Sequence, residues 1–330
     1  MRKLIVLALV LAGLYGGYWA VGASQIRGGA QAALDGMTAD GLTVQYAALT
    51  TRGFPSRFDT TLTDFTIADP ATGAGWSAPW VQVLALSYRP NHVIAAFAPE
   101  QVITLAPGQT ITVTADGLRA SGSVDLSTDL PLTALTAETG PIRLALPDGT
   151  ALAAARGLAA LRPTPAEDGA TYDLFTDLEA IALPETVKAL IDPKGTLPGT
   201  VTMIRADSAL TLDRPLDRHL GSGPAPAVQA ITLRDARVVW ADMTLAATGD
   251  LTIAPDGTPD GRIEIGATGW ERMIDLAVAA GAIDPGVAPT WVNMGRSMAQ
   301  GGPTVTLPLV FQNGRMSLGP FPLGPAPRLR

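Results

Sequence analysis

Cysteine is absent from the 330 residues of this chain. Its absence excludes disulfide bonds, thiolate metal sites, a cysteine nucleophile and a lipid-modified N-terminal cysteine. The redox compartment stays open, although a chain without thiols is safe in an oxidising one.

Charge is also scarce. Only 16% of the residues are Asp, Glu, Lys or Arg, and the formal net charge is −7. No run of Lys or Arg is longer than a pair. Because a nucleic-acid surface needs clustered cations, the sequence predicts no nucleic-acid partner.

The residues that carry most catalysis and metal binding are few. His92 and His219 are the only histidines, and neither has the partner four residues away that a helical zinc site needs. No G-x-S-x-G, Walker loop or H-E-x-x-H occurs. Asp256 and Asp260 lie at a glycine-rich turn, where aspartate commonly caps the backbone; an acid pair for glycosidic chemistry is the alternative. We therefore expect no catalytic residue, no metal, no cofactor and no enzymatic activity, and keep a hydrolase with a dispersed site as an alternative.

One long hydrophobic run lies at the N-terminus. Arg2 and Lys3 precede an uncharged stretch over residues 4–23, which as a helix is about 30 Å long, the thickness of a hydrocarbon core. The basic pair is expected to stay in the cytoplasm, so the rest is exported. The sequence predicts a single-pass membrane anchor with the bulk of the chain exported; the family resemblance given below implies that the membrane is the inner one and the compartment the periplasm. The residues assigned to the anchor are Leu4, Leu7, Leu11, Leu14, Tyr18 and Trp19.

Two fates are open for this run. Val21, Gly22 and Ala23 have the small side chains that signal peptidase selects, so cleavage after Ala23 is one of them. The run exceeds the usual signal core of about 7–15 residues, which favours a retained anchor. Amphipathic rings settle at the membrane interface, and three lie toward the outer end of the run: Tyr15, Tyr18 and Trp19.

The whole chain has 35 glycines and 27 prolines, and beyond the run these residues divide it into short segments, many with period-2 alternation. Helical spacing appears instead over residues 25–37, 184–191, 270–278 and 288–299. Methionine and tryptophan stripes on the last two are interpreted as core contacts, with a lipid-facing role as the alternative. No βαβ alternation appears. We expect a mainly β (α+β) protein, with a mostly antiparallel sheet and a few short helices after one N-terminal transmembrane helix.

Domain boundaries are marked by one composition change. The segment 162–171 is rich in proline and acidic residues, and the Ala-rich segment 151–161 before it fits either a helix or an irregular strand. The predicted organisation is an anchor over residues 1–23 and a β-rich periplasmic domain over 24–330, with possible lobes 24–161 and 172–330 joined by 162–171.

Turn motifs carry a resemblance to a known family. The first is Arg52-Gly53-Phe54-Pro55-Ser56-Arg57-Phe58, in which Gly53, Phe54 and Pro55 mark the turn. The second is a C-terminal succession of short motifs and two helices. In order, it consists of Gly249-Asp250-Leu251-Thr252-Ile253, Asp256-Gly257, Gly261-Arg262-Ile263, the two helices, Leu307-Pro308-Leu309, Asn313-Gly314-Arg315 and Leu318-Gly319-Pro320. With the N-terminal run, they make the chain resemble a bacterial family known as domain of unknown function 2125. Its C-terminal pattern is similar to that of the AsmA-like proteins of Gram-negative envelopes.

This resemblance implies an inner-membrane anchor and a long, curved periplasmic sheet with an apolar groove, implicated in lipid transport and outer-membrane upkeep. It carries over no functional residue, because the family offers no defined site to match. The function expected is lipid binding or envelope maintenance, with the membrane, lipid and envelope proteins as partners. The alternative is an interaction module whose sheet edge or groove receives a protein.

Overall fold

A computed structural model describes residues 1–165, 170–220 and 224–329. The chain forms two compact units. Unit 1 comprises Met1–Leu126 and Ala137–Gly149, and unit 2 comprises Ser127–Thr136 and Thr150–Arg330. Strand β9 (Leu132–Thr139) contains the point at which the chain returns from unit 2 to unit 1.

The N-terminal run and the helical segment after it form one helix, α1 (Arg2–Ala39, 38 residues). No proline interrupts it, so every backbone N–H beyond the first turn has its carbonyl partner four residues earlier. It ends at Asp40 and Gly41, where Gly41 takes the left-handed φ of 95° that stops a helix. The expected transmembrane segment and its continuation are therefore a single rigid element.

Unit 1 is an antiparallel sheet that divides at β4. Strands β1 and β2 pair with β3, and β3 pairs with β4. One part of β4 continues into β5 and β8, and its first residues pair instead with β6, which leads to β7 and β10. The strands are β1 (Thr43–Gln45), β2 (Ala48–Arg52), β3 (Arg57–Ala68), β4 (Gly75–Leu86), β5 (Arg89–Phe97), β6 (Glu100–Ala106), β7 (Gln109–Ala115), β8 (Arg119–Val124) and β10 (Ile142–Ala145).

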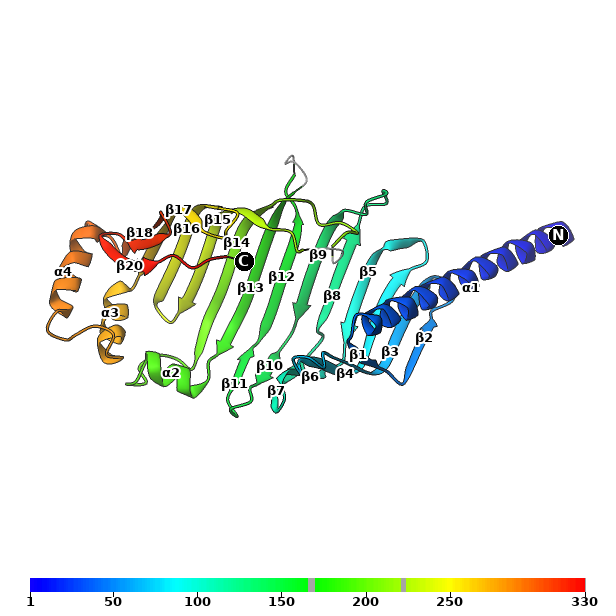
Figure 1. Cartoon of the computed structure of the whole chain (residues 1–330), viewed down its shortest axis with the longest axis horizontal. Coiled ribbons are helices and arrows are strands. Elements are labelled where there is room, and N and C mark those ends of the chain that lie inside the picture. The colour runs from blue at the N-terminus through cyan, green and yellow to red at the C-terminus, as the bar shows by residue number, and fades with distance from the viewer. Residues whose placement is uncertain (166–169, 221–223, 330) are drawn as a thin grey trace. The chain divides into compact units, whose positions relative to one another are not determined.

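Unit 2 is a meander in which each strand from β12 to β20 pairs antiparallel with the next (Figure 1). Helix α2 (Glu185–Ile191) connects β13 to β14, and α3 (Trp270–Ala279) and α4 (Ala288–Ala299) connect β17 to β18. The strands are β11 (Ala151–Ala154), β12 (Arg156–Pro163), β13 (Thr171–Ala182), β14 (Thr200–Leu212), β15 (Val228–Trp240), β16 (Met243–Ile253), β17 (Pro259–Thr268), β18 (Thr304–Gln312), β19 (Arg315–Leu318) and β20 (Phe321–Pro325).

The expected fold class is confirmed: the sheet is mostly antiparallel, and the described residues form three short helices after the N-terminal one. The segment 151–161, which fitted a helix or a strand, belongs to strands β11 and β12. The segment 162–171 comprises the end of β12, the connection to β13 and the first residue of β13, and residues 166–169 of it lie outside the described part. The division into lobes at that segment stays a prediction.

Candidate functional site

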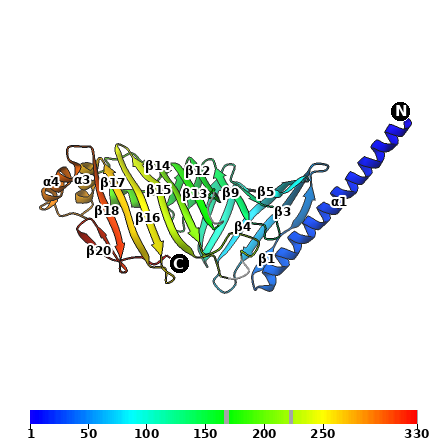
Figure 2. The same cartoon turned by 90° about the horizontal axis from the view of Figure 1, so that it is seen from above.

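The N-terminal part of α1 presents large apolar side chains to the surroundings. Leu4, Leu7, Leu11 and Leu14 are 70%, 54%, 57% and 67% exposed. By its length and composition, the helix is long and apolar enough to cross a membrane. In Figures 1 and 2 this part of α1 extends beyond the strands of unit 1. Such a surface is stable where hydrocarbon surrounds it.

The next turns of α1 are held against unit 1 by three aromatic side chains. Tyr15 donates its hydroxyl to the carbonyl of Pro55 (3.0 Å), and Tyr18 donates to the carbonyl of Ser87 (2.7 Å). The indole N–H of Trp19 donates to the carbonyl of Arg57 at 2.8 Å. The acceptors are backbone carbonyls of two adjacent turns. The rings expected at the membrane interface therefore direct their polar atoms into the protein.

Ring packing reinforces this contact. Trp19 stacks on Phe58 (centroids 5.9 Å apart) and meets Phe54 edge-on (5.5 Å). Gly22 lies against the Phe58 ring so closely that a Cβ there would be 2.7 Å from Cζ. Further along, Tyr46 donates to Oε1 of Gln31 at 2.7 Å, which ties the last part of α1 to the loop before β2. The helix thus docks on unit 1 over a large part of its length.

The turn motif at residues 52–58 is the receiving side of this contact. Gly53 has φ 107°, and a Cβ there would be 2.9 Å from the Cβ and carbonyl oxygen of Arg57, so only glycine fits. The Phe54–Pro55 peptide bond is cis. The tight turn presents the carbonyls of Pro55 and Arg57 to the helix. Sequence reasoning identified the helix and the motif separately, but nothing in the sequence signalled that they meet.

In unit 2, the register aligns four exposed apolar side chains across neighbouring strands. Leu178 lies opposite Ile204, Ile204 opposite Val238, and Val238 opposite Leu245. Directly opposed residues of an antiparallel pair share a face. Their exposed fractions are 39%, 36%, 37% and 42%. They form one apolar row that crosses β13 to β16, and Ala267 of β17 continues it.

The rest of this face carries no charge either. Side chains alternate between faces along a strand, and three further rows run parallel to the first. We call these four rows the charge-free face. Its remaining members on β13 to β17 are Thr176, Ala206, Ala236, Ala247 and Ile265; Leu174, Ser208, Leu233, Gly249 and Ile263; and Tyr172, Leu210, Ile231, Leu251 and Gly261.

The opposite face of the same strands carries the ions. Asp177 accepts from Arg205 at 2.8 Å, Asp207 accepts from Arg234 at 3.0 Å, and Asp235 accepts from Arg237 at 2.7 Å (their guanidinium groups donate). The sheet of unit 2 is therefore strongly two-sided. Exposed ion pairs add little stability, so the ion pairs alone do not explain why one face is charged and the other is not. A binding partner of the charge-free face explains this difference better.

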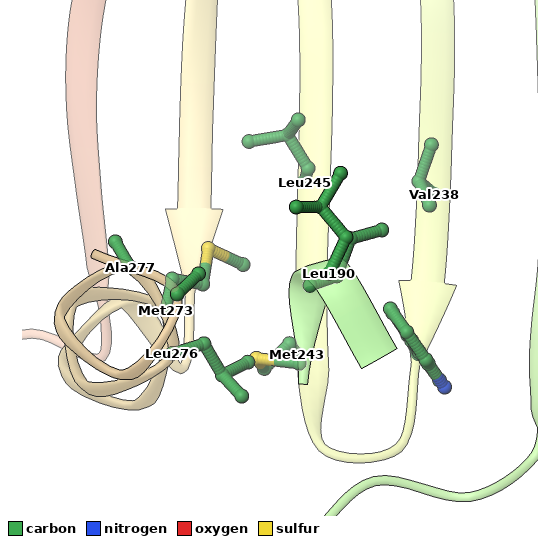
Figure 3. A pocket seen from close by; sticks show the side chains of 10 residues that line it. Leu190, Val238, Met243, Leu245, Met273, Leu276 and Ala277 are labelled. Carbon is green, nitrogen blue, oxygen red and sulfur yellow. The ribbon is translucent and has the colours of Figure 1, made fainter. Parts of the chain in front are cut away.

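An apolar pocket lies at one end of the charge-free face. Its volume is about 420 Å³, within the range of small-molecule sites. Val238 and Leu245 of the exposed row lie in its wall, and Figure 3 shows α3 seen end-on beside them. None of the ten lining residues is charged. They are Leu190, Ile191, Val238, Trp240, Met243, Leu245, Met273, Leu276, Ala277 and Ala280.

The pocket offers almost no polar group. The indole N–H of Trp240 donates to the carbonyl of Pro198 at 3.1 Å and is already satisfied. Met273 lies in the wall, whereas Trp270 packs on Gly295 of α4, where a Cβ would be 2.4 Å from the ring. The stripe on α3 therefore supplies a core contact and a pocket wall together. The pocket suits an apolar group and has nothing to anchor a charged one.

A buried carboxylate fixes the segment that follows α2. Asp192 is 2% exposed and accepts from the backbone N–H of Leu197 (2.6 Å) and the hydroxyl of Thr196 (3.1 Å). Burial acts to raise the pKa of Asp192, but the hydrogen bonds from residues 196 and 197 outweigh it, so the pKa is lowered. This carboxylate holds the end of the helix that contributes Leu190 and Ile191 to the pocket.

The histidines and the acid pair lie elsewhere. His92 is exposed on β5 and His219 is exposed in a loop, and neither lines the pocket. Asp256 accepts from the backbone N–H (3.1 Å) and the hydroxyl (2.8 Å) of Thr258, which is the turn capping expected for it. Within the described ranges, no group of three or more His, Cys, Asp or Glu residues is placed to hold a metal ion.

Comparison with known proteins gives one match. A family model described as an uncharacterized protein conserved in bacteria (DUF2125) matches residues 19–327. The match begins at Trp19 and so includes the turn motif, the charge-free face and the pocket. No curated protein and no solved structure matches the chain.

Proposed function

We propose that the chain, which belongs to the DUF2125 family, is a non-enzymatic membrane-anchored protein that binds the hydrocarbon part of a lipid on the charge-free face of unit 2. The observation that carries the proposal is the exposed apolar row that leads into a pocket without charge. In this account α1 holds the protein in the bacterial inner membrane, unit 2 works in the periplasm, and the activity serves maintenance of the envelope.

Exposure of this apolar row to water is unfavourable in free energy. Apolar surface removed from water gains about 25 cal/mol per Å², and Leu178, Ile204, Val238 and Leu245 each keep more than a third of their surface exposed. Contiguous apolar patches on a soluble surface commonly mark an interaction site. A ligand that covers the row recovers this free energy.

The dimensions fit an extended hydrocarbon chain. Four neighbouring strands place the ends of the row about 14 Å apart, and the pocket adds a recess beside Val238 and Leu245. A chain laid across the strands would end among Met243, Met273 and Leu276, whose flexible and apolar side chains adapt to such a group. Its polar headgroup would stay outside the pocket.

Two features of the sequence support the proposal, the charges at the N-terminus and the C-terminal pattern. Arg2 and Lys3 precede the apolar part of α1, an arrangement that keeps the N-terminus in the cytoplasm and exports the rest. We extend the proposal to the role that the sequence resemblance to AsmA-like proteins implies, which is lipid transport and outer-membrane upkeep. A protein partner for this face is the second candidate, because an exposed apolar sheet face also suits protein docking.

Mass spectrometry of lipids that co-purify with the full chain in mild detergent tests the proposal. We expect retained lipid in the wild type and a several-fold loss in Leu245→Asp, which puts a charge in the exposed row and the pocket wall. Thr244→Asp is the matched control, because Thr244 is the adjacent residue on the opposite face of β16. Equal lipid in both variants, or none in the wild type, would contradict the proposal; a retained protein in place of lipid would favour the second candidate.

A further inference from the structure

The docking of α1 on unit 1 begins inside the apolar run. The first contact is that of Tyr15, and Tyr18 and Trp19 follow one turn later. From Leu4 to Tyr15 the helix rises about 16 Å, and to Trp19 about 22 Å. A hydrocarbon core is about 30 Å thick. The free part of α1 is thus too short to cross the core before unit 1 begins.

The part of unit 1 that meets the helix at this level consists of two turns, residues 53–56 and 87–88, which we call the tip. They are joined by a hydrogen bond from the backbone N–H of Ser87 to the carbonyl of Ser56 at 2.9 Å. The Ser87 side chain is 1% exposed and lies 3.1 Å from the hydroxyl of Tyr15. Tip and helix are therefore one packed structure rather than two parts on a loose tether.

The surface of the tip is aromatic at its end and basic around it. Phe54 is 60% exposed and Tyr88 is 67% exposed. Arg52, Arg57 and Arg89 flank the two turns and are also exposed, and Arg57 pairs with Asp59 at 2.9 Å. With three arginines and one aspartate, this end of unit 1 is net positive in a chain whose net charge is −7. Aromatic rings favour the interfacial layer, and guanidinium groups bind phosphate through paired N–H donors.

We propose that the tip of unit 1 is embedded in the outer-leaflet interface of the membrane that α1 crosses, with Phe54 and Tyr88 below the phosphates and the arginines beside them. The tip then completes the span that the free part of α1 leaves short. Three backbone carbonyls in or next to the tip, those of Pro55, Arg57 and Ser87, already accept hydrogen bonds from the aromatic side chains of the helix. It is a second membrane contact, which fixes the distance of unit 1 from the bilayer. The inference rests on α1 as a membrane helix and is independent of lipid binding by unit 2.

The absence of cysteine allows a direct test, because a single introduced cysteine takes a fluorescent label at one position only. Phe54→Cys and Tyr88→Cys are labelled in the full chain and placed in vesicles of phosphatidylcholine and phosphatidylglycerol. Ala71→Cys is the matched control, an exposed residue in the turn at the other end of the β3–β4 hairpin. Circular dichroism first establishes that each labelled chain is folded.

Lipids with a quencher near the headgroup report the depth of each label whichever way the chain inserts. We expect several-fold stronger quenching at positions 54 and 88 than at position 71, with blue-shifted emission at the two tip positions. Equal quenching at all three positions, with emission typical of water, would show that the tip lies outside the bilayer and overturn the inference. That outcome would leave the lipid proposal for unit 2 intact.

Discussion

Trp19 stacks on Phe58 with ring centroids 5.9 Å apart and planes inclined by 25°. One residue belongs to the apolar run and the other closes the turn motif, so this pair joins helix α1 to the sheet of unit 1. Phe58 is 4% exposed. The two features that carried the family resemblance near the N-terminus are thus two sides of one contact.

This contact predicts that the anchor is retained. Ala23 is 8% exposed in the middle of α1, and Gly22 beside it lies against Phe58. Cleavage after Ala23 would require the docked helix to open around the site. We expect the intact mass of the purified protein to include residues 1–23, and N-terminal sequencing that finds Ser24 first would show that the docked helix is removed.

Gly22 should tolerate no side chain. Gly22→Ala places a methyl group 2.7 Å from the Phe58 ring, and overpacking of this kind costs about 1–3 kcal/mol. Gly17→Ala is the matched control, since a Cβ at Gly17 meets nothing within 4 Å and alanine favours a helix by about 1 kcal/mol. Thermal unfolding in mild detergent should therefore show a lower midpoint for the first variant and an unchanged or higher one for the second.

The two phenylalanines of the motif should differ in their effect on stability. Phe58→Ala removes a buried ring, which costs about 3–5 kcal/mol in typical cores. Phe54→Ala removes a ring that is 60% exposed, so its free energy of unfolding in detergent should change much less. Urea unfolding compares the two, and equal losses would mean that Phe58 is not the central contact.

The segment after α2 should loosen in acid. The folded-state pKa of Asp192 lies below its ordinary value because residues 196 and 197 donate hydrogen bonds to it. Its contribution to stability is therefore present above the unfolded pKa of about 3.9 and is lost as pH falls through the lower folded value. Asp192→Asn should be less stable than the wild type at pH 7, and this difference should shrink below about pH 4. A difference independent of pH would contradict the role of the charge.

The sequence was sufficient to predict the helices, but not to predict which side chains share one face of the sheet. The apolar run predicted α1, and helical spacing predicted α2, α3 and α4. The charge-free face is hidden in the sequence because alternation breaks on β15. Leu233 and Ala236 share that face although three positions separate them, since a bulge inserts an extra residue between them. Period-2 counting assigns one of the two to the wrong side.

The contact between α1 and the turn motif could not be predicted from the sequence for a different reason. The aromatic residues of α1 fit a membrane interface by composition alone, so the expectation placed their polar atoms toward lipid headgroups. In the structure the hydroxyl of Tyr18 reaches the carbonyl of Ser87, which is 69 positions away. A contact of that range depends on how β3 and β4 fold back, and no local pattern encodes it.

The central claim, that lipid lies on the charge-free face, is tested most directly by photo-crosslinking in cells at two adjacent residues of β15. A diazirine amino acid at Val238 points into the exposed row and the pocket, whereas one at Val239 points to the opposite face, beside Met203. We predict lipid adducts at position 238 and several-fold fewer at position 239. Equal labelling at the two positions, or adducts at 238 that contain protein but no lipid, would contradict the account.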